Sequence, residues 1–200
     1  SFLNYMYPVE DAIMDSLDKP DWIHHVLTKM LDKKLKVIER AGKIELDLVE
    51  TGGGAGSSTL ISPEMHEEFC LPYDIIQHKA LHEGNTKIVY HLCGGLMPLL
   101  ETVAKNGADG LETMTPPAMG GDCNLREADK RVGDKLFFIG GFDQTAGFEN
   151  GDPADIKRMV FELFESCPNG GYICSPSDHF FFGKPENIKA FRDAVFECVY

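Results

Sequence analysis

Positively charged side chains are scarce in this sequence of 200 residues, which has 19 Lys and Arg against 32 Asp and Glu. The formal net charge at pH 7 is −13. A surface with this charge repels phosphate backbones, so we expect no nucleic-acid partner. A polyanionic substrate would likewise require a local basic pocket to offset the overall charge.

Long apolar runs are also absent. No apolar stretch of the sequence approaches the roughly 20 residues that a membrane-spanning helix needs. The chain does not open on a basic, apolar and then small-residue leader of the kind that directs secretion. We therefore expect no membrane partner.

Cysteines are too sparse for a scaffold that depends on disulfides, since the sequence contains six of them. Disulfide-rich domains are typically short and secreted, with many more cysteines for their length. Reduced thiols fit this number better, and they predict a cytoplasmic protein.

Linkers and low-complexity segments are missing as well, so we predict a single domain over residues 1–200. Hydrophobic residues make up 43% of the chain and charged residues 26%, which is an ordinary balance for a globular protein. This composition is sufficient for a sizeable core.

What the sequence does contain is a regular alternation of helical and strand-like segments. Apolar periodicity and capping residues predict helices over residues 21–40, 62–83 with a kink near Pro72, 98–106, 124–132, 152–166 and from 185. Short apolar runs predict strands over residues 44–49, 87–92, 110–112, 136–140 and 172–174. Such alternation favours an α/β fold built from parallel βαβ units.

Reactive or polar side chains stand at the ends of these strands: Glu50, His91 with Cys93, Glu112, Asp143 and Cys174. In α/β barrels the active site is built at the carboxyl ends of the strands. A closed barrel has eight strands, and only five are predicted here. The sequence therefore predicts the latter part of a barrel or an incomplete one, and its start at Ser1 suggests a processed or cut chain.

His91 and Cys93 are two residues apart, which on a strand places both side chains on the same face. They could therefore hold one metal ion together. An isolated pair of this kind is equally explained by packing, and Cys174 alone is explained as a small buried hydrophobe.

Four segments together resemble the uroporphyrinogen decarboxylase family: "LISPEMHEEFCLPY", "YHLCGGLMPLLETVAKNGADGL", "LFFIGGFDQ" and "GGYICSPSD". They occur in the family's order, and the likeness covers residues from about 10 to 200. The resemblance implies a (β/α)8 TIM barrel, of which this chain would be the C-terminal portion with about five βα units.

Within this family the chain is most similar to the methylcobalamin:coenzyme M methyltransferase branch, in which a His-x-Cys pair and a later Cys bind zinc. The resemblance implies zinc on His91, Cys93 and Cys174, with methylcobalamin carried by a partner corrinoid protein and a small thiol as acceptor. Two thiolates and one imidazole leave a zinc position open, and zinc lowers the pKa of a thiol that occupies it. We therefore expect a zinc-dependent methyltransferase that moves a methyl group from a corrinoid to a thiol.

Further site residues follow from the strand ends and from the glycine-rich stretch "TGGGAGSS". Glu50, Glu112 and Asp143 are expected as catalytic residues, and Asp143 is favoured because "GGFDQ" resembles the family's Gly-x-x-Asp segment. Substrate contacts are expected at Gly52, Gly53 and Gly54, although a plain flexible turn explains them too. Asp178 and His179 are further candidates as ligands or as partners of ligands.

Two other functions stay open on sequence grounds. The first is uroporphyrinogen decarboxylase, a lyase of porphyrin biosynthesis that needs no metal. The second is a truncated, non-catalytic barrel fragment, because five parallel strands leave two open edges that favour pairing with another copy or another chain.

Overall fold

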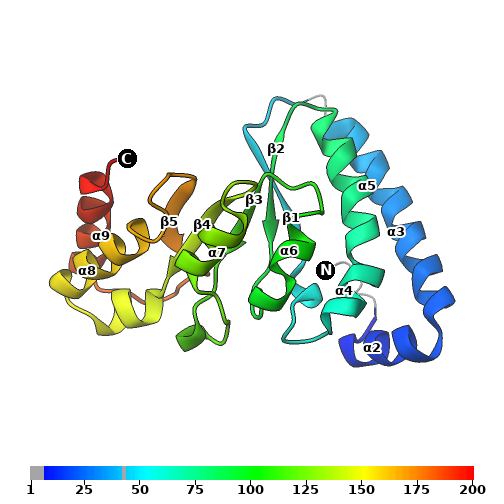
Figure 1. The fold of residues 1–200 in the computed structure, drawn as a ribbon, viewed down its shortest axis with the longest axis horizontal. Coiled ribbons are helices and arrows are strands. Elements are labelled where there is room, and N and C mark those ends of the chain that lie inside the picture. Colours follow the sequence, from blue (N-terminus) through cyan, green and yellow to red (C-terminus); the bar gives the residue numbers. More distant parts are fainter. Residues whose placement is uncertain (1–6, 42–43) are drawn as a thin grey trace.

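The computed structural model describes residues 7–41 and 44–200, which form a parallel sheet with helices around it (Figure 1). The strands are β1 (Leu48–Gly52), β2 (Lys87–His91), β3 (Gly110–Thr113), β4 (Phe137–Phe142) and β5 (Tyr172–Pro176). The α-helices are α2 (Val9–Asp18), α3 (Pro20–Ala41), α4 (Pro63–Phe69), α5 (Leu71–His82), α6 (Leu100–Val103), α7 (Leu125–Val132), α8 (Pro153–Phe164) and α9 (Pro185–Glu197). This alternation confirms the predicted α/β class.

The five strands lie in the order β1-β2-β3-β4-β5, and each neighbouring pair is parallel. All carboxyl ends therefore lie at one edge, as predicted. Gly52 of β1 pairs with His91 of β2, and His91 pairs with Glu112 of β3. β1 and β5 are the outer strands, so the sheet is an open array of the kind expected for part of a barrel.

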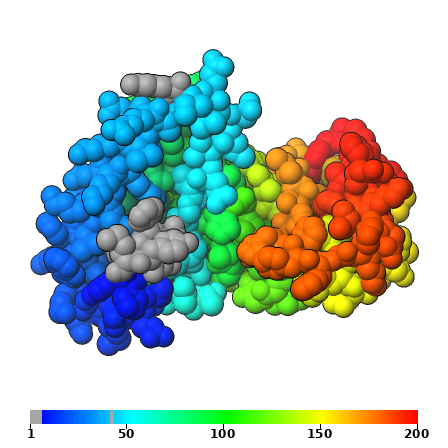
Figure 2. Space-filling model, turned by 180° about the vertical axis from the view of Figure 1, so that it is seen from behind, coloured from blue at the N-terminus to red at the C-terminus, as the bar shows by residue number. Residues whose placement is uncertain are grey.

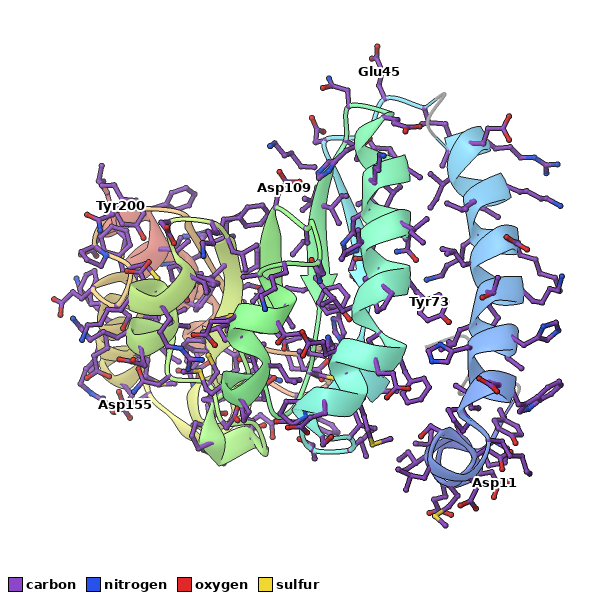
Figure 3. All side chains as sticks on the ribbon, turned by 45° about the vertical axis from the view of Figure 1, so that its right-hand side comes forward. Asp11, Glu45, Tyr73, Asp109, Asp155 and Tyr200 are labelled. Atoms are coloured by element: carbon purple, nitrogen blue, oxygen red, sulfur yellow. The ribbon has the colours of Figure 1, made fainter. Side chains whose placement is uncertain are left out.

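Helices pack in groups along this array. Figure 1 shows α3 and α5 side by side at one end of the molecule, and α8 and α9 together at the other. Tyr73 reaches from α5 toward α3 (Figure 3), where its hydroxyl lies 2.8 Å from Nδ1 of His24 in a hydrogen bond. Within residues 7–41 and 44–200, no helix combines the length and apolar character that crossing a membrane requires.

The predicted capping residues start three of the helices. Ser62 Oγ, Asn124 Oδ1 and Asp152 Oδ1 each accept a hydrogen bond from a backbone N–H two or three residues later. These bonds satisfy backbone donors that have no partner inside the helix. The predicted kink near Pro72 is a full break at Cys70, which separates α4 from α5.

Two predicted boundaries differ from the structure. β1 begins at Leu48 rather than Ile44, because its only neighbour is β2 and their pairing starts with Leu48 and Lys87. The helix predicted over residues 98–106 is a 3-10 turn followed by the short α6. Beyond it the chain turns, and Asn106 Oδ1 accepts a hydrogen bond from the N–H of Ala108 (2.8 Å).

The core lies between the sheet and the helices. One buried cluster joins β2, β3 and β4 to α6 and α7, and includes Tyr90, Leu111 and Phe138. A second cluster, with Phe142 and Val160 at its centre, joins β4 to α8 and α9. Because side chains alternate along a strand, the residues next to these buried ones point to the opposite face.

Two titratable side chains hold α5 against the sheet. Oδ2 of Asp74 accepts a hydrogen bond from the Tyr90 hydroxyl (2.7 Å). Nδ1 of His78 donates to the carbonyl of Asn106 (2.8 Å), so its Nε2 accepts from the Thr51 hydroxyl (2.9 Å). Burial raises the pKa of Asp74 to about 6 and lowers the pKa of His78 to about 4.

These two shifts have opposite effects on stability as the pH falls. His78 destabilises the folded state as the pH falls from its unfolded pKa toward 4, because the unfolded chain binds the proton first. Asp74 acts in the opposite direction, because the folded state is relieved of a buried negative charge as the pH falls through about 6. We predict that Asp74→Asn removes the compensating effect. Its free energy of unfolding should fall relative to wild type by about 2–3 kcal/mol between pH 7.5 and pH 4. Urea unfolding at both pH values measures this, and an equal pH dependence of the two proteins would contradict it.

Candidate metal centre

Three potential metal ligands meet at the carboxyl end of the sheet. Parallel pairing puts His91 directly beside Glu112, and His91 Nδ1 lies 2.7 Å from Glu112 Oε1. Glu50 comes from β1, with its Oε1 4.0 Å from the same nitrogen. One ligand atom from each of these residues lies within 4.8 Å of the other two, so the group could hold a metal ion.

The donor chemistry of this group fits a divalent cation. Zinc accepts imidazole nitrogen and carboxylate oxygen as ligands, and oxygen-rich sets also suit harder divalent ions. The side chains of His91 and Glu112 are 28% and 21% exposed, whereas that of Glu50 is 60% exposed. His91 and Glu112 thus form the inner part of the site, and Glu50 forms its rim.

Cys93 lies beside this group, as the spacing predicted. Hydrogen bonding with Cys93, followed by the hydrogen bond to Glu112, raises the pKa of His91 to about 10. The same hydrogen bond with His91 lowers the pKa of the Cys93 thiol, against which burial and the negative charge of Asp178 both act. In the absence of a metal, a positive charge on His91 and a negative charge on Cys93 therefore stabilise each other.

The backbone just after Glu112 is strained. Thr113 and Met114 have φ values of +74° and +46°, in the left-handed region that side chains with a Cβ rarely adopt. Such residues cost about 1–3 kcal/mol each and persist only where surrounding contacts hold them. The Thr113 hydroxyl donates to the carbonyl of Leu92 (3.2 Å) and accepts from the Thr115 hydroxyl (3.0 Å). These bonds fix the end of β3 and with it the position of Glu112.

A cleft of about 470 Å³ opens over the candidate ligands. Among the described residues, its lining contains three carboxylates, two imidazoles and no Lys or Arg: Glu50, His91, Glu112, Thr113, Ile139, Ser175, Pro176, Ser177, Asp178, His179 and Phe180. The last part of this lining belongs to the segment after β5, which lies on the surface beside the green part of the chain in Figure 2. The cleft therefore suits a cation better than an anion.

Cys174 does not join His91 and Cys93 in the structure. It packs against the buried cluster under α8 and α9, on the helix side of the sheet. Its neighbour Ile173 pairs with Ile139, which lines the cleft, so alternation along β5 turns Cys174 away from the cleft. The expected trio of ligands is therefore replaced by an imidazole and two carboxylates with one thiol nearby.

Two of the three glycines expected to contact substrate, Gly53 and Gly54, have a packing role in the structure. A Cβ at Gly53 would lie 2.3 Å from the Tyr90 ring, and one at Gly54 would lie 3.3 Å from Cys93 Sγ. Gly52 and Gly53 line a second, largely apolar cavity of about 180 Å³ under α2 and α3 rather than the cleft. Their contact with substrate stays a prediction.

Asp143 is placed outside the cleft lining, at the end of β4. Its Oδ1 accepts a hydrogen bond from the N–H of Ala146 (2.8 Å), which starts the π-helical turn Thr145–Asn150. A catalytic role for Asp143 stays a prediction. Glu50 and Glu112 lie in the site as expected, but as potential ligands. Ser177, which also lines the cleft, was missed because a serine after a strand carries no distinctive sequence signal.

Comparison with known proteins places this geometry in context. The sequence profile "Uroporphyrinogen decarboxylase (URO-D)" matches residues 1–198. The chain is 29% identical over 198 residues to a uroporphyrinogen decarboxylase of Pseudomonas fluorescens, covering 90% of this chain and 49% of the relative. It is 28% identical over 161 residues to one of Geobacter sulfurreducens, covering 78% of this chain and 41% of the relative.

Among solved structures, the fold is similar to that of a methyltransferase from Methanosarcina mazei, with a TM-score of 0.79 and 19% sequence identity. The match covers 95% of this chain and 53% of that chain. The chain thus spans about half the length of the relatives that it matches. Because the profile matches nearly all of it, the chain belongs to the uroporphyrinogen decarboxylase family.

Proposed function

We propose that this chain carries the metal-binding part of an enzyme that transfers a methyl group from a methylated corrinoid protein to a small thiol. The observation that carries the proposal is the convergence of Glu50, His91 and Glu112 within 4.8 Å at the carboxyl edge of the sheet. Zinc is the ion we propose, because imidazole and carboxylate are among its usual ligands. The structural likeness to a methyltransferase supports this choice over other chemistry on the same fold.

Each residue of the centre has a distinct task in this proposal. His91, Glu112 and Glu50 hold the ion, which when bound lowers the pKa of an incoming thiol. Glu112 orients the imidazole of His91, to which it is already hydrogen-bonded. Glu50, at the exposed rim, would complete the site. The acidic cleft disfavours the entry of anions, so the acceptor thiol enters in its neutral form.

Uroporphyrinogen decarboxylase is the second candidate, because the curated relatives carry that name. A substrate with several carboxylates requires cationic partners, and the lining formed by residues 7–41 and 44–200 has three carboxylates and no Lys or Arg. This lining favours methyl transfer over decarboxylation. The two functions also differ in their need for metal.

The test is the metal content of the purified protein together with two activity assays. We expect about one zinc per chain after purification in zinc-containing buffer, measured by elemental analysis. Methyl transfer from methylcobalamin to a small thiol should be detected by the spectral change of the cobalamin. Metal-free protein that consumes uroporphyrinogen at the same rate with and without a chelator would overturn the proposal in favour of the decarboxylase.

We further propose that the open sheet is completed by additional strands, from another chain or another copy. Each outer strand has an accessible apolar side chain: Ile173 of β5 is 54% exposed and Leu48 of β1 is 40% exposed. Exposed apolar surface between open strand edges favours pairing. We predict that the isolated chain self-associates in sedimentation experiments, and that Ile173→Lys shifts it toward monomer. A monomeric wild-type chain at micromolar concentration would contradict this.

A further inference from the structure

A second cavity, separate from the cleft over the metal centre, lies among the helices on the other face of the sheet. It has a volume of about 180 Å³ and is lined by α2, α3, α4, α5, the turn after β1, and Tyr90 of β2. Tyr90 is 1% exposed and stands next to His91, which lines the cleft. Alternation along β2 therefore turns these two side chains to opposite faces, and the cavity is distinct from the proposed metal site.

Most of the cavity wall is apolar. α3 contributes Ile23, Leu27, Met30 and Leu31, whose spacing places them along one face of the helix. Tyr73, which Figure 3 shows reaching from α5 toward α3, also lines the cavity. An apolar cavity of about 150 Å³ is large enough to bind benzene. This cavity therefore has room for an apolar group of about the size of one aromatic ring.

Two side chains of opposite charge, Asp74 and Lys34, interrupt the apolar wall. Oδ2 of Asp74 accepts a hydrogen bond from the Tyr90 hydroxyl, and Nζ of Lys34 donates one to Oε1 of Gln77, each at 2.7 Å. Burial lowers the pKa of Lys34, and the negative charge of Asp74 acts against this shift. The two charges thus lie near enough to influence each other inside a mainly apolar space.

The two charges do not contact each other directly. Within residues 7–41 and 44–200, no ion pair joins Lys34 to Asp74, and each is held by a different neutral side chain. Charged groups in apolar surroundings are costly unless they are paired and hydrogen-bonded. A hydroxyl between them would serve both, because its O–H donates to a carboxylate and its oxygen accepts from an ammonium. Because the two charges cancel, a neutral group suits this position better than an ion.

We propose that this cavity binds a small neutral molecule that has a ring-sized apolar body and a hydroxyl group. The hydroxyl lies between Lys34 and Asp74, and the body lies against the apolar face of α3. Apolar walls with a few convergent polar groups are the general character of small-molecule sites in proteins. This inference is independent of the proposed metal site, which faces the cleft on the other side of the sheet.

Benzyl alcohol is a suitable probe, and ligand-observed NMR titration against the chain measures its affinity. Hydrogen bonds to charged groups should make benzyl alcohol bind at least about tenfold more tightly than toluene, which has the same ring and no hydroxyl. Lys34→Met keeps an unbranched side chain without the ammonium, so it should weaken the binding of benzyl alcohol about tenfold and leave that of toluene unchanged. Equal affinity of wild type for the two probes would overturn the inference.

A second set of variants tests whether the probe occupies this cavity. Leu27→Trp should fill the cavity and abolish the binding of benzyl alcohol. Val37→Trp is the matched control, because it places the same side chain on α3 at a position that is 65% exposed and outside the lining. It should bind benzyl alcohol like wild type.

Ala12→Leu fills the cavity more mildly from α2, and it replaces Leu27→Trp if circular dichroism shows that the tryptophan disturbs the fold. Wild type that binds neither probe would overturn the inference. So would a folded cavity-filling variant that binds benzyl alcohol as tightly as wild type. Zinc affinity of the same wild-type sample tests the metal centre separately, so the failure of one proposal is distinguishable from the failure of the other.

Discussion

His91→Ala should lose zinc binding almost completely, with an affinity at least about 100-fold below that of wild type. His91 is the central residue of the triad, since both Glu112 and Glu50 have a carboxylate oxygen within 4.0 Å of its Nδ1. Removal of the imidazole leaves two carboxylates, and the repulsion between their negative charges disfavours their close approach. Isothermal titration with zinc measures the effect directly.

The fold should survive this substitution, because the His91 side chain lies outside the two buried clusters. A catalytic metal sits on a scaffold that other packing stabilises, unlike the metal of a zinc finger. The control is His25→Ala, which removes an exposed imidazole of α3 and should leave zinc affinity unchanged. Equal zinc affinity of His91→Ala and His25→Ala would show that the triad is not the metal site.

The order of elements could be predicted from the sequence because it depends on local chemistry. Capping by Ser62, Asn124 and Asp152 follows from side-chain oxygens that reach backbone donors two or three residues away. The helix Val9–Asp18 was missed, since its start at Pro8 has no side-chain cap. The first strand was predicted too early because Ile44 and Leu46 have an apolar character that the structure leaves exposed.

The candidate site could be predicted only as far as strand ends and faces allow. His91, Glu112 and Glu50 stand at the ends of neighbouring strands, so parallel order alone brings them together. The expected role of Cys174 depended on a finer property, the face to which one residue of β5 points. A shift of one residue along a strand reverses that face, and the sequence of a short strand does not determine it.

The close approach of β3 and β4 is the structural feature on which the position of Glu112 most depends. Gly140 of β4 pairs with Thr113, the residue that follows Glu112. A Cβ at Gly140 would lie 2.2 Å from the carbonyl oxygen of Thr113, and φ at this glycine is +116°. Both the space and the backbone conformation therefore require glycine at this position.

Gly140→Ala should consequently lower the free energy of unfolding by about 3–5 kcal/mol, the sum of a left-handed backbone cost and an unrelieved clash. The clash is with backbone, which a rotamer change cannot relieve, so the strands must separate and carry Glu112 with them. Gly120→Ala is the matched control: φ there is +83°, but a Cβ would meet nothing within 4 Å, so only the backbone cost of about 1–2 kcal/mol applies. Chemical denaturation measures both variants. If Gly140→Ala lowers the free energy of unfolding no more than Gly120→Ala does, β3 and β4 can separate freely. If Gly140→Ala also keeps the zinc affinity of wild type, the metal centre does not depend on the close approach of these strands.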